Sequence, residues 1–245
     1  MRQVPEKKSA TYLIVGNGRV ASHFAHYFTS LQIPFKQFTR NSNIPFQECL
    51  AGISHVLVLI HDREIVPFVE KFKGFGKESV IWVHFSGLLN TELAYSAHPL
   101  ASFSNRIFDP DFYKSIPFAL IRGGIPFTEL LPGLPNPHFE IYLEEKERYH
   151  AMCVVAGNFS TLLWMQFAEF LRQELKVPDR LMFPYLRSTL YNLENTDDPL
   201  TGPLKRDDQK TIQRNLAALE GTSVFDLYKA FLKFYSNQLK NEKHT

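Results

Sequence analysis

The sequence predicts an α/β protein in which a doubly wound, mostly parallel sheet is followed by a smaller, all-helical C-terminal domain. Short apolar runs alternate with amphipathic segments over the first 143 residues, the order expected when helices connect parallel strands. The first apolar run ends in a glycine-rich turn that opens a helix. Strand patterns stop near Glu144, and long amphipathic stretches follow.

The first strand is expected over residues 11–15, TYLIV, whose near-continuous apolarity is typical of a parallel strand covered on both faces. After the glycine turn, apolar residues at positions 20, 21, 24, 28 and 31 recur at helical spacing, and Pro34 closes the segment. We therefore expect one strand, one turn and one helix in this region.

The same pattern continues along the chain. A helix is expected to begin at Asp62, with its side chain as the N-cap, and to end before Gly74 and Gly76. Two of the later strands fall in a proline-rich region and are expected to lie toward an edge of the sheet. The strands expected after the first are residues 35–39, 56–60, 80–83, 118–121 and 139–143.

We place the domain boundary between residues 1–143 and residues 144–245. The second part carries two long helical patterns, residues 145–175 and 224–239. Its apolar positions exceed what a short bundle needs to cover the first domain, so we expect a homodimer. The aromatic stripe on the last helix favours a core or a dimer interface over a cofactor site, and it consists of Phe225, Tyr228, Phe231, Phe234 and Tyr235.

Composition excludes several classes of protein. The net charge is +2, with 27 basic and 25 acidic residues mixed along the chain, so no basic stripe suggests nucleic acid as a partner. The apolar run near the N-terminus is too short for a signal peptide or a membrane span, so we expect a soluble, cytoplasmic protein. Cys49 and Cys153 lie far apart, which argues against a disulfide framework or a zinc site and favours small buried hydrophobes.

A GxGxxA signature occupies the first turn, with Gly16, Gly18 and Ala21 at its fixed positions. The first glycine allows the tight turn, the second lets a pyrophosphate approach the backbone, and the small third residue allows close packing of helix on strand. A phosphate then lies on the free N–H groups of the helix that starts near Arg19. Because the motif follows a strand and opens a helix, it predicts a Rossmann dinucleotide-binding site rather than a bare tight turn.

The loop after the second strand reads Thr39-Arg40-Asn41-Ser42, where an NAD-binding domain usually carries an acidic residue for the ribose hydroxyl. A guanidinium group matches a phosphate, so Arg40 favours the 2′-phosphate of NADP, the alternative being a solvated loop arginine. The predicted cofactor residues are Gly16, Asn17, Gly18, Arg19, Val20, Ala21, Thr39, Arg40, Asn41, Ser42, His61, Asp62 and Ser86.

Several further motifs follow in order, namely HFSG at residues 84–87, AHPL at 97–100, YHA at 149–151, AGN at 156–158 and LTGPLKRDD at 200–208. Over nearly its whole length the chain resembles the Rossmann-like NADP-binding proteins with an uncharacterised helical C-terminal domain, relatives of pyrroline-5-carboxylate reductase, ketopantoate reductase and the β-hydroxyacid dehydrogenases. The resemblance implies an NADP-binding N-terminal domain, a helical C-terminal domain that often makes a dimer, and an active-site cleft between them.

The resemblance also implies roles for individual residues. Ser86 and Gly87 would lie beside the nicotinamide, and His98 with Pro99 would line the substrate side. Asn158 matches the asparagine that β-hydroxyacid dehydrogenases direct at the substrate. Those enzymes place a catalytic lysine one helical turn earlier, where this chain has Val154, so the usual proton donor is missing from its expected place.

The histidines of the chain are the candidates for the proton donor of the reaction. Hydride transfer to a carbonyl or imine needs a proton source, and His98, expected to follow a strand at the carboxyl edge of the sheet, suits this role as well as it suits a turn-stabilising histidine. His150 lies two helical turns before Asn158 and is a second candidate. His84 is expected to be a satisfied core histidine. Solvated loop charges are expected for Lys205, Arg206 and Asp208.

Two functions from different classes follow from these residues. The first is an NADP-dependent reductase of a small keto acid or cyclic imine, with His98, Asn158, Ser86 and His150 as the candidate catalytic residues. The second is a non-catalytic NADP-binding sensor or partner-binding protein, which the valine at position 154 favours. Turnover of a substrate would separate the two.

Overall fold

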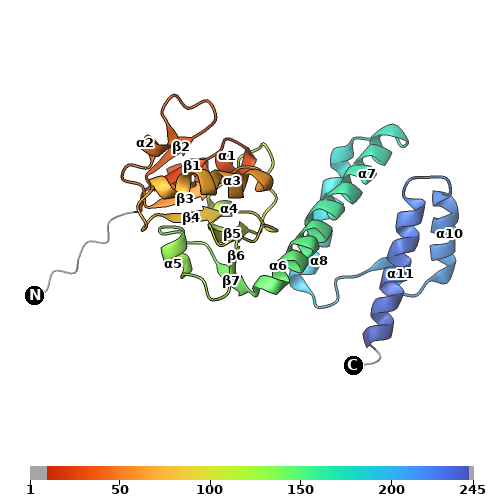
Figure 1. The fold of residues 1–245 in the computed structure, drawn as a ribbon. Coiled ribbons are helices and arrows are strands. Elements are labelled where there is room, and N and C mark those ends of the chain that lie inside the picture. The colour runs from red at the N-terminus through yellow and green to blue at the C-terminus, as the bar shows by residue number, and fades with distance from the viewer. Residues whose placement is uncertain (1–9, 243–245) are drawn as a thin grey trace, which may run out of the picture. The chain divides into compact units, whose positions relative to one another are not determined.

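The computed structural model describes residues 10–242, and Figure 1 shows a sheet flanked by helices followed by helical hairpins. The chain divides into two compact units, Met1–Trp164 and Met165–Thr245. The first contains every strand of the described chain, and the second is helical.

The first unit is built on a seven-stranded sheet with the strand order β2-β1-β3-β4-β5-β6-β7. Strands β1 to β5 run parallel, β6 is antiparallel to β5, and β7 is parallel to β6. The predicted mostly parallel sheet is therefore confirmed. The strands are β1 (Tyr12–Val15), β2 (Phe35–Phe38), β3 (His55–Val58), β4 (Ile81–His84), β5 (Tyr95–Pro99), β6 (Phe118–Ile121) and β7 (His138–Ile141).

Helices cover both faces of the sheet, as a doubly wound fold requires. Helix α1 (Arg19–Ser30) packs Phe24 and Phe28 on one face, against a core that also contains Tyr113 of α4 (Pro110–Ser115). Helix α3 (Asp62–Phe72) packs Ile65 and Val69 on the other face, together with α2 (Phe46–Cys49). Successive strand residues alternate between the two cores, because side chains on a strand point to opposite faces. The short elements are η1 (Lys73–Phe75), α5 (Phe127–Leu130) and η2 (Leu143–Glu145).

Strand β5 was not predicted, and it corrects the expected position of His98. The segment YSAHP is short and carries serine, histidine and proline, so it lacks the apolar run that marks β1, β3, β4 and β6. It nevertheless pairs with β4 on one side and with β6 on the other, where His98 faces Ala119. His98 therefore lies within a strand, next to its last residue, and not in a loop after it.

Helices begin directly after the last strand, with α6 (Lys146–Cys153), a π-helical segment η3 (Val154–Phe159) and α7 (Ser160–Gln173). The change from strands to helices thus coincides with the expected boundary after residue 143, whereas the first compact unit extends to Trp164. The difference arises because the start of α6 packs on the sheet: Lys146 is buried, and its ammonium donates to Ser96 of β5.

The helical stretch Leu143–Gln173 is also long and apolar enough to cross a membrane by length and composition, with a mean hydropathy of 1.3 and 6% of its most apolar window buried. The expectation of a protein outside the membrane rested on the short apolar run near the N-terminus and not on this stretch. Lys146 at its start donates to the sheet of the first unit, which anchors this end of the stretch to a polar environment.

The second unit contains the end of α7 and the helices that follow it. Helices α10 and α11 form a hairpin (Figure 1), and Asn215 donates to the Tyr228 hydroxyl across it. Among its described residues only Ala168, Leu171 and Ile212 are buried apolar side chains. The elements are η4 (Asp179–Met182), α8 (Phe183–Asn195), α9 (Gly202–Lys205), α10 (Gln209–Leu219) and α11 (Phe225–Glu242).

Two expectations about polar and sulfur side chains need revision. Cys49 and Cys153 are free thiols and only half-buried, although Cys49 packs against the core beneath α2 and α3. The charges near residue 205 are not simply solvated: Lys205 forms an ion pair with Asp198 at 2.6 Å, and Asp208 caps helix α10 by accepting from the Thr211 amide. Both interactions lie within the second unit.

Candidate functional site

The glycine turn at the end of β1 requires glycine at its first position. Gly16 has a φ of +121°, and a Cβ atom there would lie 2.3 Å from the backbone oxygen of Leu59, at the end of β3. Hydrogen bonds fix the turn from the other side, since the Gly16 amide donates to Phe38 and the Gln37 side chain donates to the Gly16 oxygen. No side chain other than hydrogen fits without moving the ends of two strands.

Gly18 differs from Gly16 because a Cβ atom there would meet no atom within 4 Å. It is the N-cap of α1 and provides no capping side chain, so the amides of the first turn face open space. Free amides and the positive end of the helix dipole favour an anion at this point. Ala21 is buried and packs α1 on the sheet, as predicted for the third small residue of the motif.

A cavity of about 950 Å³ opens in front of this turn. Strand β1 lies between β2 and β3, so the chain reverses direction in the strand order here, and ligands of open α/β sheets bind at such a point. All predicted cofactor residues except Ala21 and Ser42 line the cavity. Those that do are Gly16, Asn17, Gly18, Arg19, Val20, Thr39, Arg40, Asn41, His61, Asp62 and Ser86.

The loop after β2 holds Arg40 at one end of the cavity. Thr39 and Ser42 close the loop, because the Thr39 amide donates to the Ser42 hydroxyl at 2.9 Å and the Ser42 amide donates back to the Thr39 oxygen. Ser42 thus shapes the loop and does not line the cavity. Arg40 is exposed, and Arg19 of α1 and Lys71 of α3 line the same cavity, so three cations are available to a ligand.

Asp62 does not cap α3 as expected. The N-cap is His61, which makes no side-chain capping bond, and Asp62 is the first residue of the helix. The Ser86 hydroxyl donates to the Asp62 carboxylate and accepts from the amides of Leu88 and Leu89. These bonds fix the orientation of Ser86 at the end of the cavity.

Two histidines meet above Gly87, the residue after Ser86. A Cβ atom on Gly87 would lie 2.3 Å from the His150 ring and 3.0 Å from the His98 ring, so only glycine allows both rings to approach the backbone. The ring centroids of His98 and His150 are 6.0 Å apart. His98 Nδ1 lies 3.0 Å from the hydroxyl of Tyr149, on α6. The structure thus brings Ser86, His98 and His150 together, as the sequence predicted.

The protonation of His98 follows from its surroundings. Burial, assisted by the neighbouring His150 and Lys146, lowers the pKa of His98 to about 4. At neutral pH the imidazole is therefore uncharged and can donate one N–H bond, but it does not carry the second proton expected of a general acid. Burial and the neighbouring Cys153 thiol raise the pKa of Tyr149, so its hydroxyl keeps its proton.

Sequence reasoning missed Lys146. Its side chain is 3% exposed, and the ammonium donates to the Leu89 oxygen and, at 2.8 Å, to the Ser96 hydroxyl. Burial lowers the pKa of Lys146 to about 8, while the carboxylate of Asp62 opposes the shift. In the sequence Lys146 stands in a run of charged residues that resembles a solvated helix start, so no signal distinguished it.

His84 is buried as expected, but it is not satisfied. Neither of its ring nitrogens has a hydrogen-bond partner among the described residues. Burial, with a contribution from Lys146, lowers the pKa of His84 to about 3 and keeps the ring neutral. Buried polar atoms without partners are rare and destabilising, so we expect a ligand or water to bind the two ring nitrogens of His84.

The remaining predicted residue, Asn158, is not part of this group. It is exposed in the π-helical segment, and none of its hydrogen bonds connects it with His98, His150 or Ser86. The extra residue in a π-helical turn changes the angle between His150 and Asn158 relative to the two regular turns assumed from the sequence.

Comparisons with known proteins agree with the fold. Residues 127–234 match a family model described as a domain of unknown function, DUF2520. No curated protein matches the sequence. Among solved structures, a Bacteroides fragilis protein provisionally described as an NADP oxidoreductase has a TM-score of 0.74 at 18% identity, covering 93% of this chain and 98% of that chain.

Two further solved structures were determined with NADP. A pyrroline carboxylate reductase from Plasmodium falciparum with NADP bound has a TM-score of 0.62 at 11% identity, covering 92% of this chain and 98% of that one. An imine reductase from Myxococcus stipitatus in complex with NADP⁺ has a TM-score of 0.62 at 12% identity, covering 95% of each chain. At these identities the likeness establishes the fold that these NADP-dependent enzymes share.

The lowered pKa of His98 predicts a loss of stability in acid. The folded pKa lies below the ordinary value of 6.5, so this contribution is complete above pH 6.5 and is lost as the pH falls toward 4. For this one group we expect the free energy of unfolding to fall by roughly 2 kcal/mol between pH 7 and 4.5. Urea unfolding of the wild type and of His98→Asn measures the difference.

His26, which is exposed on α1, provides the matched control. His26→Asn should keep the pH dependence of the wild type, whereas His98→Asn should make it shallower, with the remaining slope due to the buried His84 and His55, whose pKa values burial also lowers. An NMR titration that places the His98 midpoint near 6.5 would contradict the burial argument.

Proposed function

We propose that the protein is an NADP(H)-dependent reductase of a small keto acid or cyclic imine. One observation carries the proposal. Arg40, the glycine turn and Ser86 all line one cavity, at the point where the strand order of the sheet reverses. Gly87 then connects this cavity to the two histidines. The NADP-dependent reductases with the same fold support the reaction class.

The residues of the cavity fit the dinucleotide. The absent Cβ of Gly18 leaves the space that a pyrophosphate needs, and the first amides of α1 can bind it. Arg40 and Lys71 can bind a 2′-phosphate, and the loop at residues 39–42 carries no carboxylate to repel it.

Bound NADPH supplies the hydride, so the reduction of a C=O or C=N bond consumes one further proton. Neutral His98 can donate an N–H bond to the substrate oxygen or nitrogen and polarise it. Ser86 is held by Asp62 and positions its hydroxyl at the end of the cavity. His150, the second candidate from the sequence, remains as the proton source, and Asn158 orients the substrate if the role implied by the resemblance holds.

A non-catalytic NADP-binding sensor is the alternative function. It is favoured by the valine at position 154 and by a His98 that stays neutral. The two functions share the cofactor site and differ only in turnover.

Cofactor preference tests the first step of the proposal. We expect NADPH to bind more tightly than NADH, and Arg40→Ala to weaken NADPH binding by about 10-fold to 100-fold because a charge-assisted bond to phosphate is lost. The affinity for NADH should stay the same. Isothermal titration calorimetry with both cofactors measures the effect.

Lys36 on β2 is a suitable control, because its ammonium donates to the Ala51 oxygen and it does not line the cavity. Lys36→Ala should bind both cofactors as the wild type does. Gly18→Val should fold, since nothing lies within 4 Å of a Cβ atom at this position, but should not bind either cofactor. Equal affinities for NADPH and NADH in the wild type would remove the argument from Arg40.

Turnover tests the second step. We expect NADPH oxidation with at least one small keto acid or cyclic imine in a screen, and a loss of roughly 10²-fold or more in kcat when both His98 and His150 are replaced by alanine. Asn158→Ala tests the orienting role separately. Tight NADPH binding without turnover of any compound would favour the sensor.

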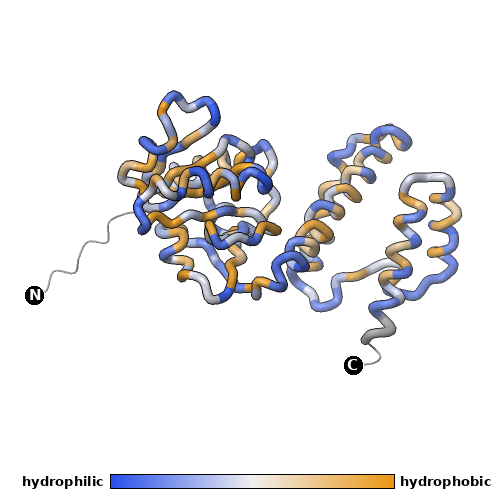
Figure 2. Tube along the Cα trace, viewed as in Figure 1, coloured by the Kyte–Doolittle hydropathy of each residue, from blue (hydrophilic) through white to orange (hydrophobic). Residues whose placement is uncertain are grey.

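We also propose that the protein forms a homodimer through its helical part. With three buried apolar side chains among its described residues, the second unit has too small a core to be stable in a single chain. On α11, Leu227, Phe231 and Phe234 are spaced so that they share one exposed face. Figure 2 shows hydrophobic residues along α7, α8 and α11. A second copy would cover these faces.

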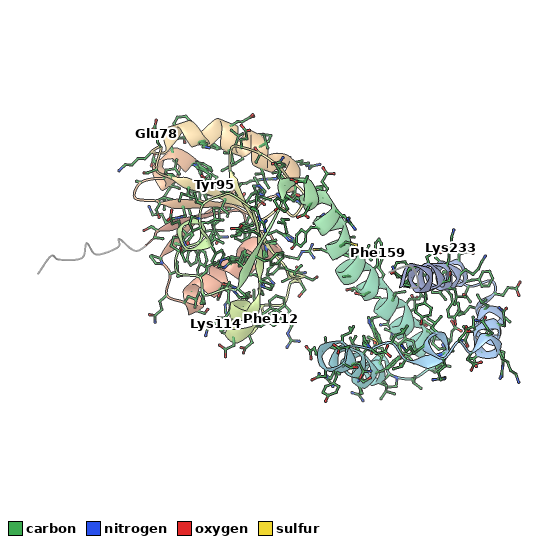
Figure 3. The ribbon with its side chains drawn as sticks, turned by 90° about the horizontal axis from the view of Figure 1, so that it is seen from below. Glu78, Tyr95, Phe112, Lys114, Phe159 and Lys233 are labelled. Atoms are coloured by element: carbon green, nitrogen blue, oxygen red, sulfur yellow. The ribbon has the colours of Figure 1, made fainter. Side chains whose placement is uncertain are left out.

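Sedimentation at micromolar concentration without detergent should therefore give twice the chain mass of 28.3 kDa. Phe231→Glu should shift the protein toward the monomer, whereas Lys233→Glu, at an exposed position of the same helix (Figure 3), should not. A monomer without detergent, or sedimentation only with lipid vesicles, would refute the dimer.

A further inference from the structure

A second cavity, of about 480 Å³, lies over β4 and β5. Neighbouring parallel strands are usually connected by a helix that covers the sheet, but residues 85–94 connect these two strands without one. None of the residues that line this second cavity belongs to the cofactor cavity. Glu78 and Tyr95, which are labelled in Figure 3, belong to its lining. The apolar part of the lining includes Trp82, Leu89, Leu93, Tyr95, Ile121 and Leu143.

Lys146 lines this cavity and has capacity for one more bond. Its ammonium has three N–H donors, and the Leu89 oxygen and the Ser96 hydroxyl take two of them. No carboxylate of the described residues forms an ion pair with it, although Asp62 acts on it from a greater distance. A buried cation without a counter-ion is unfavourable, so the position favours an anion.

His84 lines the same cavity and provides an independent second observation. Its side chain is fully buried, and both ring nitrogens lack partners among the residues that the structure describes. The strand register places His84 opposite Ser96, which accepts from Lys146. A neutral imidazole has one N–H donor, so the ammonium and the imidazole together offer two donors from one side of the cavity.

The charges around Lys146 indicate a ligand with a single negative charge. At the cavity wall the cations Lys73 and Arg122 are balanced by the anions Glu78 and Glu92. Deeper in the unit, Asp62 faces Lys146 from α3, while His84 on β4 and His98 on β5 are held neutral by burial. The ammonium is then the one buried charge that a ligand has to neutralise.

We propose that this second cavity binds a small carboxylate with an apolar body, whose carboxylate accepts hydrogen bonds from the Lys146 ammonium and the His84 imidazole. Two acceptor oxygens match the two donors, and the apolar lining accommodates the rest of the molecule. The site is separate from the cofactor cavity, so it exists whether or not the protein reduces a substrate.

Benzoate and benzamide are suitable probes, because they have the same size and differ in charge. In calorimetry with the full chain at pH 7, benzoate binds and benzamide binds at least about tenfold more weakly. Saturation with NADPH leaves the benzoate affinity unchanged. Benzoate binding weakens above pH 8, because Lys146 loses its proton there while benzoate stays anionic.

Lys146→Met tests the residue directly and weakens benzoate binding at least about tenfold. Lys73→Met is the matched control, since Lys73 lines the same cavity but is exposed and donates to the Leu93 oxygen. If Lys146→Met does not fold, the pH series and the benzamide comparison on the wild type decide the question alone.

Four results would overturn the proposal: no binding at millimolar benzoate, equal binding of benzamide, displacement of benzoate by NADPH, or unchanged binding in a folded Lys146→Met variant. Each of these leaves the NADPH titration of the wild type and of Arg40→Ala untouched. The failure of this site and the failure of the proposed cofactor site can therefore be distinguished.

Discussion

The buried ammonium of Lys146 connects the helical part of the first unit to its sheet. By donating to Ser96 and to the Leu89 oxygen, it holds the first turn of α6 against β5 and against the connection between β4 and β5. Tyr149 and His150 lie on the next turn, where they contact His98 and Gly87. One hydrogen-bonded cation thus ties the helix turn before these two residues to the sheet, and a lysine at this position has a cost in desolvation that a surface lysine lacks.

A close approach of two backbone segments shapes the cofactor cavity. The backbone of Gly16 lies so near the Leu59 oxygen that the ends of β1 and β3 touch across the point where the strand order reverses. The cavity opens in front of this contact, and the first turn of α1 faces it. The fold therefore brings together binding residues from the ends of four strands, β1 to β4, and among them the Ser86 hydroxyl donates to Asp62.

Most of the sheet could be predicted from the sequence because β1, β3, β4 and β6 are largely apolar runs bounded by glycine, proline or polar residues, while β2 and β7 each hold two apolar and two polar residues. The cofactor cavity was equally predictable, since a glycine motif acts through backbone geometry that sequence spacing encodes. Strand β5 was missed because YSAHP is held by its two neighbours and not by its own composition. Lys146, the unsatisfied His84 and the Asp62–Ser86 bond were missed for a related reason: each depends on contacts between residues at least 24 positions apart, which no local pattern records.

The π-helical segment at Val154–Phe159 has a consequence for comparing this chain with its relatives. In an α-helix each backbone amide bonds to the carbonyl four positions earlier, but in a π-helical turn it bonds to the carbonyl five positions earlier. The wider turn rotates the side chains after it relative to those before it. An alignment that compares Val154 with a catalytic lysine counts residues as though the helix were regular, so it leaves this rotation out.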